Sequence, residues 1–294
     1  MNHGFQVVGI RQSDSLPALK PQNRRQKRPI ASALILLLIL SGCLACELIM
    51  TKDPSYLDLH HYSVPPDREF FFGTDTMGRD IFSMIWYGGR ISLWIGFVST
   101  FMTTAVAVIL GAISGCSPDK ADAVIMRIVD ILLSIPGLLP VVLLQAVLGM
   151  ASVLSISFVI GITGWMSMAK VVRMEVRQIR NSEYVIASAC MGGGFFHVLR
   201  HHLAPNFIPS IMFMVVMNIR SAIVAESTLS FMGIGLPVEV ISWGSMLSLA
   251  NQALSGRAWW MILMPGLFLV VTLVCLTNLG NHLRKCANKK HSNL

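Results

Sequence analysis

The most constraining feature of this sequence is a stretch without Asp, Glu, Lys or Arg that runs from residue 131 to residue 169. The hydrocarbon core of a bilayer is about 30 Å thick and takes roughly 20 helical residues to cross. At about 1.5 Å of rise per residue, the stretch is long enough for nearly two crossings. We therefore divide it near Gly149 and Ser152 into a hairpin of two membrane spans.

Four other segments are long and apolar enough to cross a membrane: residues 29–46, 91–115, 207–231 and 258–283. The chain is 54% hydrophobic and only 13% charged, with a mean hydropathy of +0.64. A water-soluble fold needs more polar surface than this composition supplies. The sequence therefore predicts an all-α membrane protein with six transmembrane helices.

The charged residues give these spans an orientation. The formal net charge is +8, and 17 of the 23 basic residues fall on one side of the six-span arrangement. In membrane proteins the cytoplasmic loops carry the excess of Lys and Arg. We therefore predict a multi-pass protein of the cytoplasmic membrane with both termini in the cytoplasm. The basic excess reflects this topology and does not indicate a nucleic-acid partner.

The spans divide the chain into five parts. Residues 1–28 are expected to form a basic cytoplasmic tail, and residues 29–50 hold the first transmembrane helix. An extracytoplasmic segment at 51–90 leads to a five-helix core at 91–283, and residues 284–294 form a second basic cytoplasmic tail.

Two prolines mark the third span. Pro136 and Pro140 remove backbone donors, so we expect the helix to kink or break there, inside protein rather than against lipid. The fourth span is expected to continue as a helix past the membrane, because residues 173–180 keep a good helix-forming composition.

A short segment of small residues, EYVIASACMGGG at 183–194, follows the fourth span. Ser182 is expected to cap a helix that has Glu183 at its positive end and is terminated by Gly192. A second short helix is expected to stop before Pro205. The pattern predicts a helix-turn-helix on the cytoplasmic face.

The surface of the first of these two helices is its informative property. Ala187 and Ser188 expose little side chain, so another protein could approach closely, while Tyr184 offers a larger contact. A short helix that enters a partner's groove is a known recognition mode. The residues alone leave this role and that of an ordinary loop packed on its own bundle equally open.

Three ionisable residues are candidates for the translocation pathway or a subunit interface: Arg220, Glu226 and Asp130. Arg220 falls near the middle of the fifth span, where a charge is costly and usually faces a cavity or a partner. The alternative is that the span boundary lies elsewhere and Arg220 extends its charge to the membrane surface, or that it pairs structurally with Glu226 or another helix. Asp130 follows Arg127 by one turn and can pair with it, and a structural role for Asp130 is favoured over a role in translocation.

No segment predicts catalysis, a cofactor site or a metal site in this chain. No lysine is followed by Ser or Thr, as a phosphate-binding P-loop requires, and HExxH and GxSxG are absent. Cys43 and Cys46 lie within the first span, where apolar packing is favoured over metal binding. The histidine pairs at 60–61 and 201–202 lack clustered carboxylates or thiols.

Four blocks of sequence resemble one known family, the permease subunits of bacterial ABC importers for dipeptides, oligopeptides and nickel, and specifically the second of the two paired permeases. The blocks are FGTDTMGRDIFSMIWYGGRISL at 72–93, MRIVD at 126–130 with Pro136, the segment 183–205, and ESTLSFMGIG at 226–235 with SWG at 242–244 and PG at 265–266. They occur in the expected order over roughly residues 70–284.

This resemblance implies a type I ABC importer permease fold in which 183–205 is a coupling region that docks on an ATPase. It implies ATPase contacts at Glu183, Tyr184, Ala187, Ser188, Gly192 and Pro205. The implied partners are a homologous permease, two ATPase subunits that bind ATP and Mg²⁺, and an extracytoplasmic substrate-binding protein. The chain itself would carry no cofactor and would be a non-enzymatic half of a pathway for di- and oligopeptides.

The coupling segment departs from the family pattern at Ile186, where an acidic residue is usual, at Ser188, and at the extra glycines 193 and 194. These departures affect the detailed contacts between the coupling segment and an ATPase. Nickel or a metal chelate is an alternative cargo within the same class. An ion-coupled secondary transporter is an alternative of another class, which would need acidic relays in the membrane and usually an internal repeat.

Overall fold

The computed structural model describes residues 29–149, 151–182, 204–237, 239–252 and 258–291. The predicted tail at 1–28 lies outside the described residues. Within them the regular elements are helical, and the only β-type pairing is an isolated bridge between Thr74 and Asp80. The all-α prediction is confirmed. The helices, in chain order, are α1 (Ile30–Leu44), α2 (Cys46–Ile49), the 3₁₀ turn η1 (Leu59–His61), α3 (Ile81–Cys116), α4 (Asp119–Leu133), α5 (Leu138–Leu148), α6 (Val153–Thr163), α7 (Trp165–Arg180), α10 (Ala204–Phe231), α11 (Trp243–Gln252) and α12 (Trp260–His291).

The described helices include three that are long and apolar enough to cross a membrane, at Ile81–Cys116, Ile211–Phe231 and Trp260–Cys286. The number rises to five if α4 with α5, and α6 with α7, each form one bent span. The apolar α1 is shorter, with 15 residues. A multi-pass membrane protein follows from these helices, whereas a count of six spans stays a prediction.

The predicted hairpin in the long uncharged stretch is confirmed. Helix α5 ends at Leu148, and Gly149 takes a positive φ of 75°, a conformation that glycine adopts without strain. Helix α6 begins at Val153 after Ser152, which forms a capping box with Ser155. The two helices then pack against each other.

The predicted break at the two prolines is also confirmed. Helix α4 ends before Pro136, and α5 starts after it with an axis turned by 83°. Pro140 is the third residue of α5, within the first turn, where a missing N–H leaves no helical bond unmade. A second bend of 44° separates α6 from α7 at Gly164, and α7 continues to Arg180 as predicted.

Helix α3 is the central element of the bundle and contacts α1, α6, α7, α10, α11 and α12. It begins at Ile81, so the last ten residues of the predicted extracytoplasmic segment are its first turns. Small residues let α7 approach closely: a Cβ at Gly111 would lie 2.7 Å from the Ala169 carbonyl oxygen. Close backbone approach at glycine is typical of helix packing in membranes.

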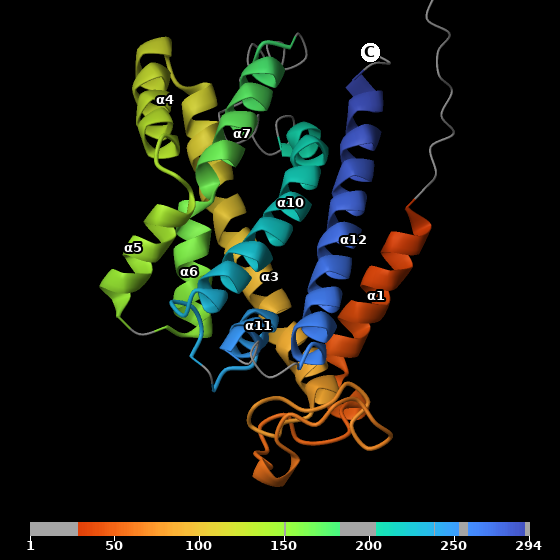
Figure 1. Cartoon of the computed structure of the whole chain (residues 1–294). Coiled ribbons are helices and arrows are strands. Elements are labelled where there is room, and N and C mark those ends of the chain that lie inside the picture. The colour runs from red at the N-terminus through yellow and green to blue at the C-terminus, as the bar shows by residue number, and fades with distance from the viewer. Residues whose placement is uncertain (1–28, 150, 183–203, 238, 253–257, 292–294) are drawn as a thin grey trace, which may run out of the picture.

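Different segments of the chain lie at the two ends of the bundle (Figure 1). The start of α1, the end of α12, helix α4 and the end of α7 lie toward the same end of the molecule. The segment between α2 and α3 covers the opposite end. This arrangement is compatible with the predicted placement of both termini on one side of the membrane.

Candidate functional site

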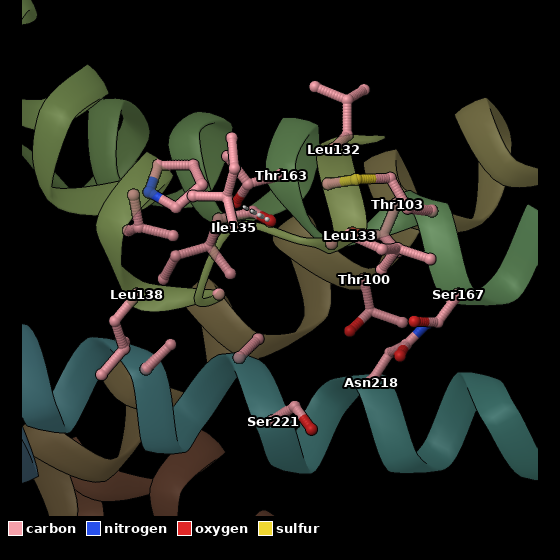
Figure 2. Close-up of a pocket in the computed structure, with 18 residues that line it drawn as sticks. Thr100, Thr103, Leu132, Leu133, Ile135, Leu138, Thr163, Ser167, Asn218 and Ser221 are labelled. Carbon is pink, nitrogen blue, oxygen red and sulfur yellow. Dashed lines mark hydrogen bonds between the residues drawn. The ribbon is translucent and has the colours of Figure 1, made fainter. Parts of the chain in front are cut away.

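A cavity of about 580 Å³ lies between α3, the α4–α5 connection, α6, α7 and α10 (Figure 2). None of its described lining residues is charged. Most of the wall is apolar, with polar side chains contributed at Thr100, Thr103, Thr163, Ser167, Asn218 and Ser221. The result is a neutral cavity with a few hydrogen-bonding groups, which is a common composition for a small-molecule site.

The broken third span supplies one wall of this cavity. Leu133, at the end of α4, and Leu138, at the start of α5, both face it, with Ile135 between them. A straight helix through this region would continue along the direction of α4. The 83° turn instead directs α5 away from that line, and the proline-containing connection and the first turn of α5 form one side of the cavity.

Two hydroxyl groups of α3 differ in how they are engaged. Thr103 Oγ1 donates to the carbonyl oxygen of Gly161 at 2.9 Å and joins α3 to α6. Thr100 is almost fully buried, and its Oγ1 has no hydrogen-bond partner among the described residues. A buried hydroxyl without a partner costs free energy. Thr100 therefore has an unused donor and acceptor beside the cavity.

Helix α10 presents one face to the cavity, made of Asn218, Ser221, Ala222 and Ala225. The spacing of three and four residues places them along one helical stripe. Asn218 Nδ2 lies 3.3 Å from Met168 Sδ. This polar stripe was readable in the sequence as Asn218 and Ser221 within an otherwise apolar span, as were Thr100 and Thr103. Sequence reasoning directed at charged residues missed them.

The predicted ATPase-coupling residues Glu183, Tyr184, Ala187, Ser188 and Gly192 lie outside the described residues. Pro205 is the second residue of α10. Two described helices flank the other coupling residues in the sequence: α7 ends at Arg180, just before Glu183, and α10 starts at Ala204, after Gly192. Both of these helices line the cavity.

Asp130 does not pair with Arg127, so the partner considered for it is wrong, whereas the structural role favoured for it agrees with an ion pair to another helix. Its carboxylate accepts from Lys170 Nζ, on α7. The tertiary contact between α4 and α7 supplies a partner that the sequence spacing could not reveal. Asp130 is half-exposed and does not line the cavity.

Arg220 is partly buried on α10 and is absent from the cavity lining. The cavity face of α10 includes positions 218, 221, 222 and 225, and the 100° step of a helix turns position 220 away from it. Arg220 makes no ion pair with Glu226, so the structural pairing considered for these two is also wrong. A role for Arg220 at a subunit interface stays a prediction.

Glu226 is fully buried and joins three helices. Its carboxylate accepts from the hydroxyl groups of Ser242 at 2.7 Å, Ser230 at 3.0 Å and Ser92 at 3.2 Å. Ser242 also caps the start of α11, where its Oγ accepts from the backbone N–H of Ser245. The carboxylate therefore sits at the positive end of α11, which favours negative charge. Glu226 lies outside the cavity lining and connects α3, α10 and α11.

A second cluster joins helices at the other end of the bundle. Asp122, in the first turn of α4, accepts from Ser114 of α3 and from the Arg173 guanidinium of α7, and Arg177 lies 3.2 Å from it. This charged first turn lies outside the apolar spans. The hydrogen bonds from Arg173 hold the pKa of Asp122 at about 2, so its carboxylate stays charged near neutral pH.

Comparison with known proteins gives a consistent result. Residues 107–286 match the family described as binding-protein-dependent transport system inner membrane component. The chain is 33% identical to the dipeptide transport system permease protein DppC of Bacillus subtilis (strain 168), over 91% of this chain and 83% of that protein. It is 35% identical to the oligopeptide transport system permease protein OppC of the same organism, over 91% and 87%. Identity to the di/tripeptide transport system permease protein DppC of Pseudomonas aeruginosa (strain UCBPP-PA14) is 30%, over 91% and 89%.

Proposed function

Because this chain belongs to the family of binding-protein-dependent transport system inner membrane components, we propose that it forms half of the pathway through which an ATP-driven importer carries di- and oligopeptides. The observation that carries the proposal is the uncharged, polar-lined cavity between α3, α5, α6, α7 and α10. The relatives named for dipeptide and oligopeptide transport support peptides as the cargo.

The chemistry of the cavity suits a peptide. Peptide groups need one donor and one acceptor each, and the exposed hydroxyl groups of Ser167 and Ser221 can serve as either. The absence of charge among the described lining residues avoids selection for or against charged side chains of the cargo. Such a wall fits a pathway that passes varied sequences, with selection left to another subunit.

The remaining parts of the proposal concern partners. A homologous permease would complete the pathway, two ATPase subunits would bind ATP and Mg²⁺ and hydrolyse ATP, and an extracytoplasmic binding protein would deliver the cargo. The termini of this chain would lie in the cytoplasm. The coupling segment 183–205 would dock on an ATPase through Glu183, Tyr184, Ala187, Ser188, Gly192 and Pro205.

The described helices support a short mechanical path for this coupling. Ser167 on α7 lies about four turns before the end of that helix, and Asn218 on α10 lies about four turns after its start. Both residues line the cavity. A force applied to 183–205 would therefore reach the cavity wall through two continuous helices, without an intervening flexible loop.

Transport in proteoliposomes tests the proposal. The chain is reconstituted with its partner permease, ATPases and binding protein, and uptake of a radiolabelled dipeptide is measured with and without ATP. We expect uptake only with ATP and binding protein. Gradient-driven peptide uptake by this chain alone would instead establish a secondary transporter, and ATP-dependent uptake of Ni²⁺ in place of peptide would establish the metal alternative.

A further inference from the structure

A second cavity lies on a different face of the bundle, between α1, α3, α10 and α12. Its volume is about 750 Å³, within the roughly 300–1,000 Å³ range of small-molecule sites. It shares no lining residue with the cavity assigned to the pathway. On α3 and on α10 the two cavities use different sides of the helix, so a partner that completes the pathway would leave the second cavity facing elsewhere.

The wall of this second cavity is apolar and open to the membrane. Helix α1 contributes Leu36, Leu40 and Leu44, and α3 contributes Trp94 and Phe97. The side chains of Leu44 and Phe97 are 77% and 62% exposed. Exposed apolar side chains on a membrane helix face hydrocarbon, so a chain of methylene groups could enter between them from the side.

One charged residue, Arg90, stands among the described residues of this wall. It is the last charge before the uncharged stretch of α3, and Glu47 is the first charge after that of α1. Such charges mark the edge of the hydrocarbon. The two side chains lie 3.4 Å apart. The cavity therefore begins at the extracytoplasmic edge of the membrane and extends into it.

The Arg90 guanidinium has donors to spare. Its described contacts, to Glu47 and to the Cys46 sulfur, both use Nη1, and the side chain is 47% exposed. A guanidinium carries five N–H donors and can hold a phosphate with two parallel hydrogen bonds. The Glu47 carboxylate, which is 74% exposed, lies beside it. A cation and an anion side by side are complementary to a ligand group that itself carries a phosphate and an ammonium.

We propose that this cavity is a binding site for a phospholipid with a zwitterionic phosphoethanolamine headgroup. The phosphate would bind Arg90, the ammonium would lie against Glu47, and one acyl chain would occupy the apolar wall between α1 and α3. A phosphoglycerol headgroup lacks the ammonium, and Glu47 would repel its net negative charge. The proposal does not depend on which cargo the transporter carries.

Native mass spectrometry of the complete complex in mild detergent tests the headgroup assignment. Phosphatidylethanolamine and phosphatidylglycerol with matched acyl chains are titrated separately. We expect one phosphatidylethanolamine to be retained per chain, with about tenfold weaker binding of phosphatidylglycerol.

Arg90→Ala should weaken phosphatidylethanolamine binding about tenfold. Glu47→Gln should remove the preference between the two lipids. Arg68→Ala, at an exposed arginine outside the cavity, is the matched control and should bind as the wild type does.

A second pair of variants tests the acyl-chain site. Leu40→Trp should fill the cavity and abolish retention of the lipid, whereas Leu38→Trp, at an exposed position of α1 outside the lining, should not. Unchanged phosphatidylethanolamine affinity in both Arg90→Ala and Leu40→Trp would overturn the proposal. A photo-crosslinker at position 40 that captures the partner permease in place of lipid would overturn it as well. The Arg90 and Glu47 variants leave the apolar lining residues unchanged, so they decide the matter if Leu40→Trp fails to fold.

Discussion

At the scale of single residues, buried polar groups connect the helices of this protein. Glu226 binds α3, α10 and α11 through serine hydroxyls, and Asp122 binds α3, α4 and α7 through Ser114 and Arg173. Neither group lines the cavity assigned to the pathway. Substitutions of Glu226 and Asp122 are therefore expected to change the stability of the protein, separately from any effect on transport.

Replacing Glu226 with leucine should destabilise the protein by about 3 kcal/mol, because four buried serine hydroxyls, those of Ser92, Ser227, Ser230 and Ser242, would lose this acceptor. Glu226→Gln keeps an acceptor at the same place and should cost less than half as much. The melting temperature of the purified complex in detergent measures both effects. Thr228→Val is the control, since Thr228 bonds only within its own helix, to the Val224 carbonyl. A Glu226→Leu variant as stable as the control would contradict this account.

Asp122→Asn should destabilise the protein by about 2 kcal/mol at neutral pH, since the pKa of the carboxyl falls from 3.8 to about 2 on folding. A lowered pKa stabilises the folded state above the unfolded value, and this stabilisation is lost as pH falls toward the folded value. The difference from wild type should thus stay constant from pH 8 to about pH 5 and shrink below pH 4. Melting curves across this range measure it. A difference that changes between pH 8 and pH 6 would contradict the assignment.

At the scale of elements, close packing of α3 on α7 depends on glycine. A Cβ at Gly111 would lie 2.7 Å from the Ala169 carbonyl oxygen and 2.8 Å from the Val172 Cβ, which are distances that real side chains avoid. Gly111→Val should therefore force the helices apart and cost roughly 1–3 kcal/mol.

The control for this variant is Gly137→Ala, because a Cβ at Gly137 meets nothing within 4 Å and its φ of −55° suits any residue. Melting temperatures of the two variants in detergent make the comparison. Equal loss of stability would show that the α3–α7 contact is not as close as described.

The elements were predictable where the signal is local. The break is predictable from Pro136 and Pro140, and the hairpin from Gly149. Proline restricts its own backbone and lacks an N–H, and glycine alone adopts a positive φ without strain, so both signals are local. The pairing of Asp130 with Lys170 was not predictable, because it depends on α4 lying against α7. The bend at Gly164 was missed for a related reason: glycine tolerates a straight helix, and contact with Thr103 becomes visible only in the fold.

At the scale of the whole molecule, the cavity arises from four separate stretches of sequence, within residues 100–103, 132–141, 160–167 and 218–225. The sequence indicated a membrane permease from its spans and its motifs. It did not indicate that uncharged residues such as Thr100 and Asn218 would line the same cavity, because this depends on how α3 packs against α10. The three ionisable candidates, Asp130, Arg220 and Glu226, all lie outside the described lining of this cavity, which carries no charge.

The coupling proposal also belongs to the whole molecule. Gly192→Asp, or a charge at Ala187, should leave the permease in the membrane but reduce ATP-dependent uptake at least tenfold, because a charge opposes docking of a small-residue helix in a groove. Co-purification of the ATPases and peptide uptake are the measurements. Normal uptake in these variants would count against the role given to 183–205.

The accessibility of position 221 in the assembled transporter tests the central claim most directly. In a complex whose native cysteines are replaced, Ser221→Cys is treated with a membrane-impermeant thiol reagent, with and without peptide-loaded binding protein, during ATP turnover. The claim predicts labelling that peptide suppresses. Phe101→Cys, on the 70% exposed apolar face of α3, should stay unlabelled in both conditions. A Ser221→Cys that reacts no faster than Phe101→Cys, or at a rate that peptide does not change, would contradict the claim that this cavity is half of the pathway.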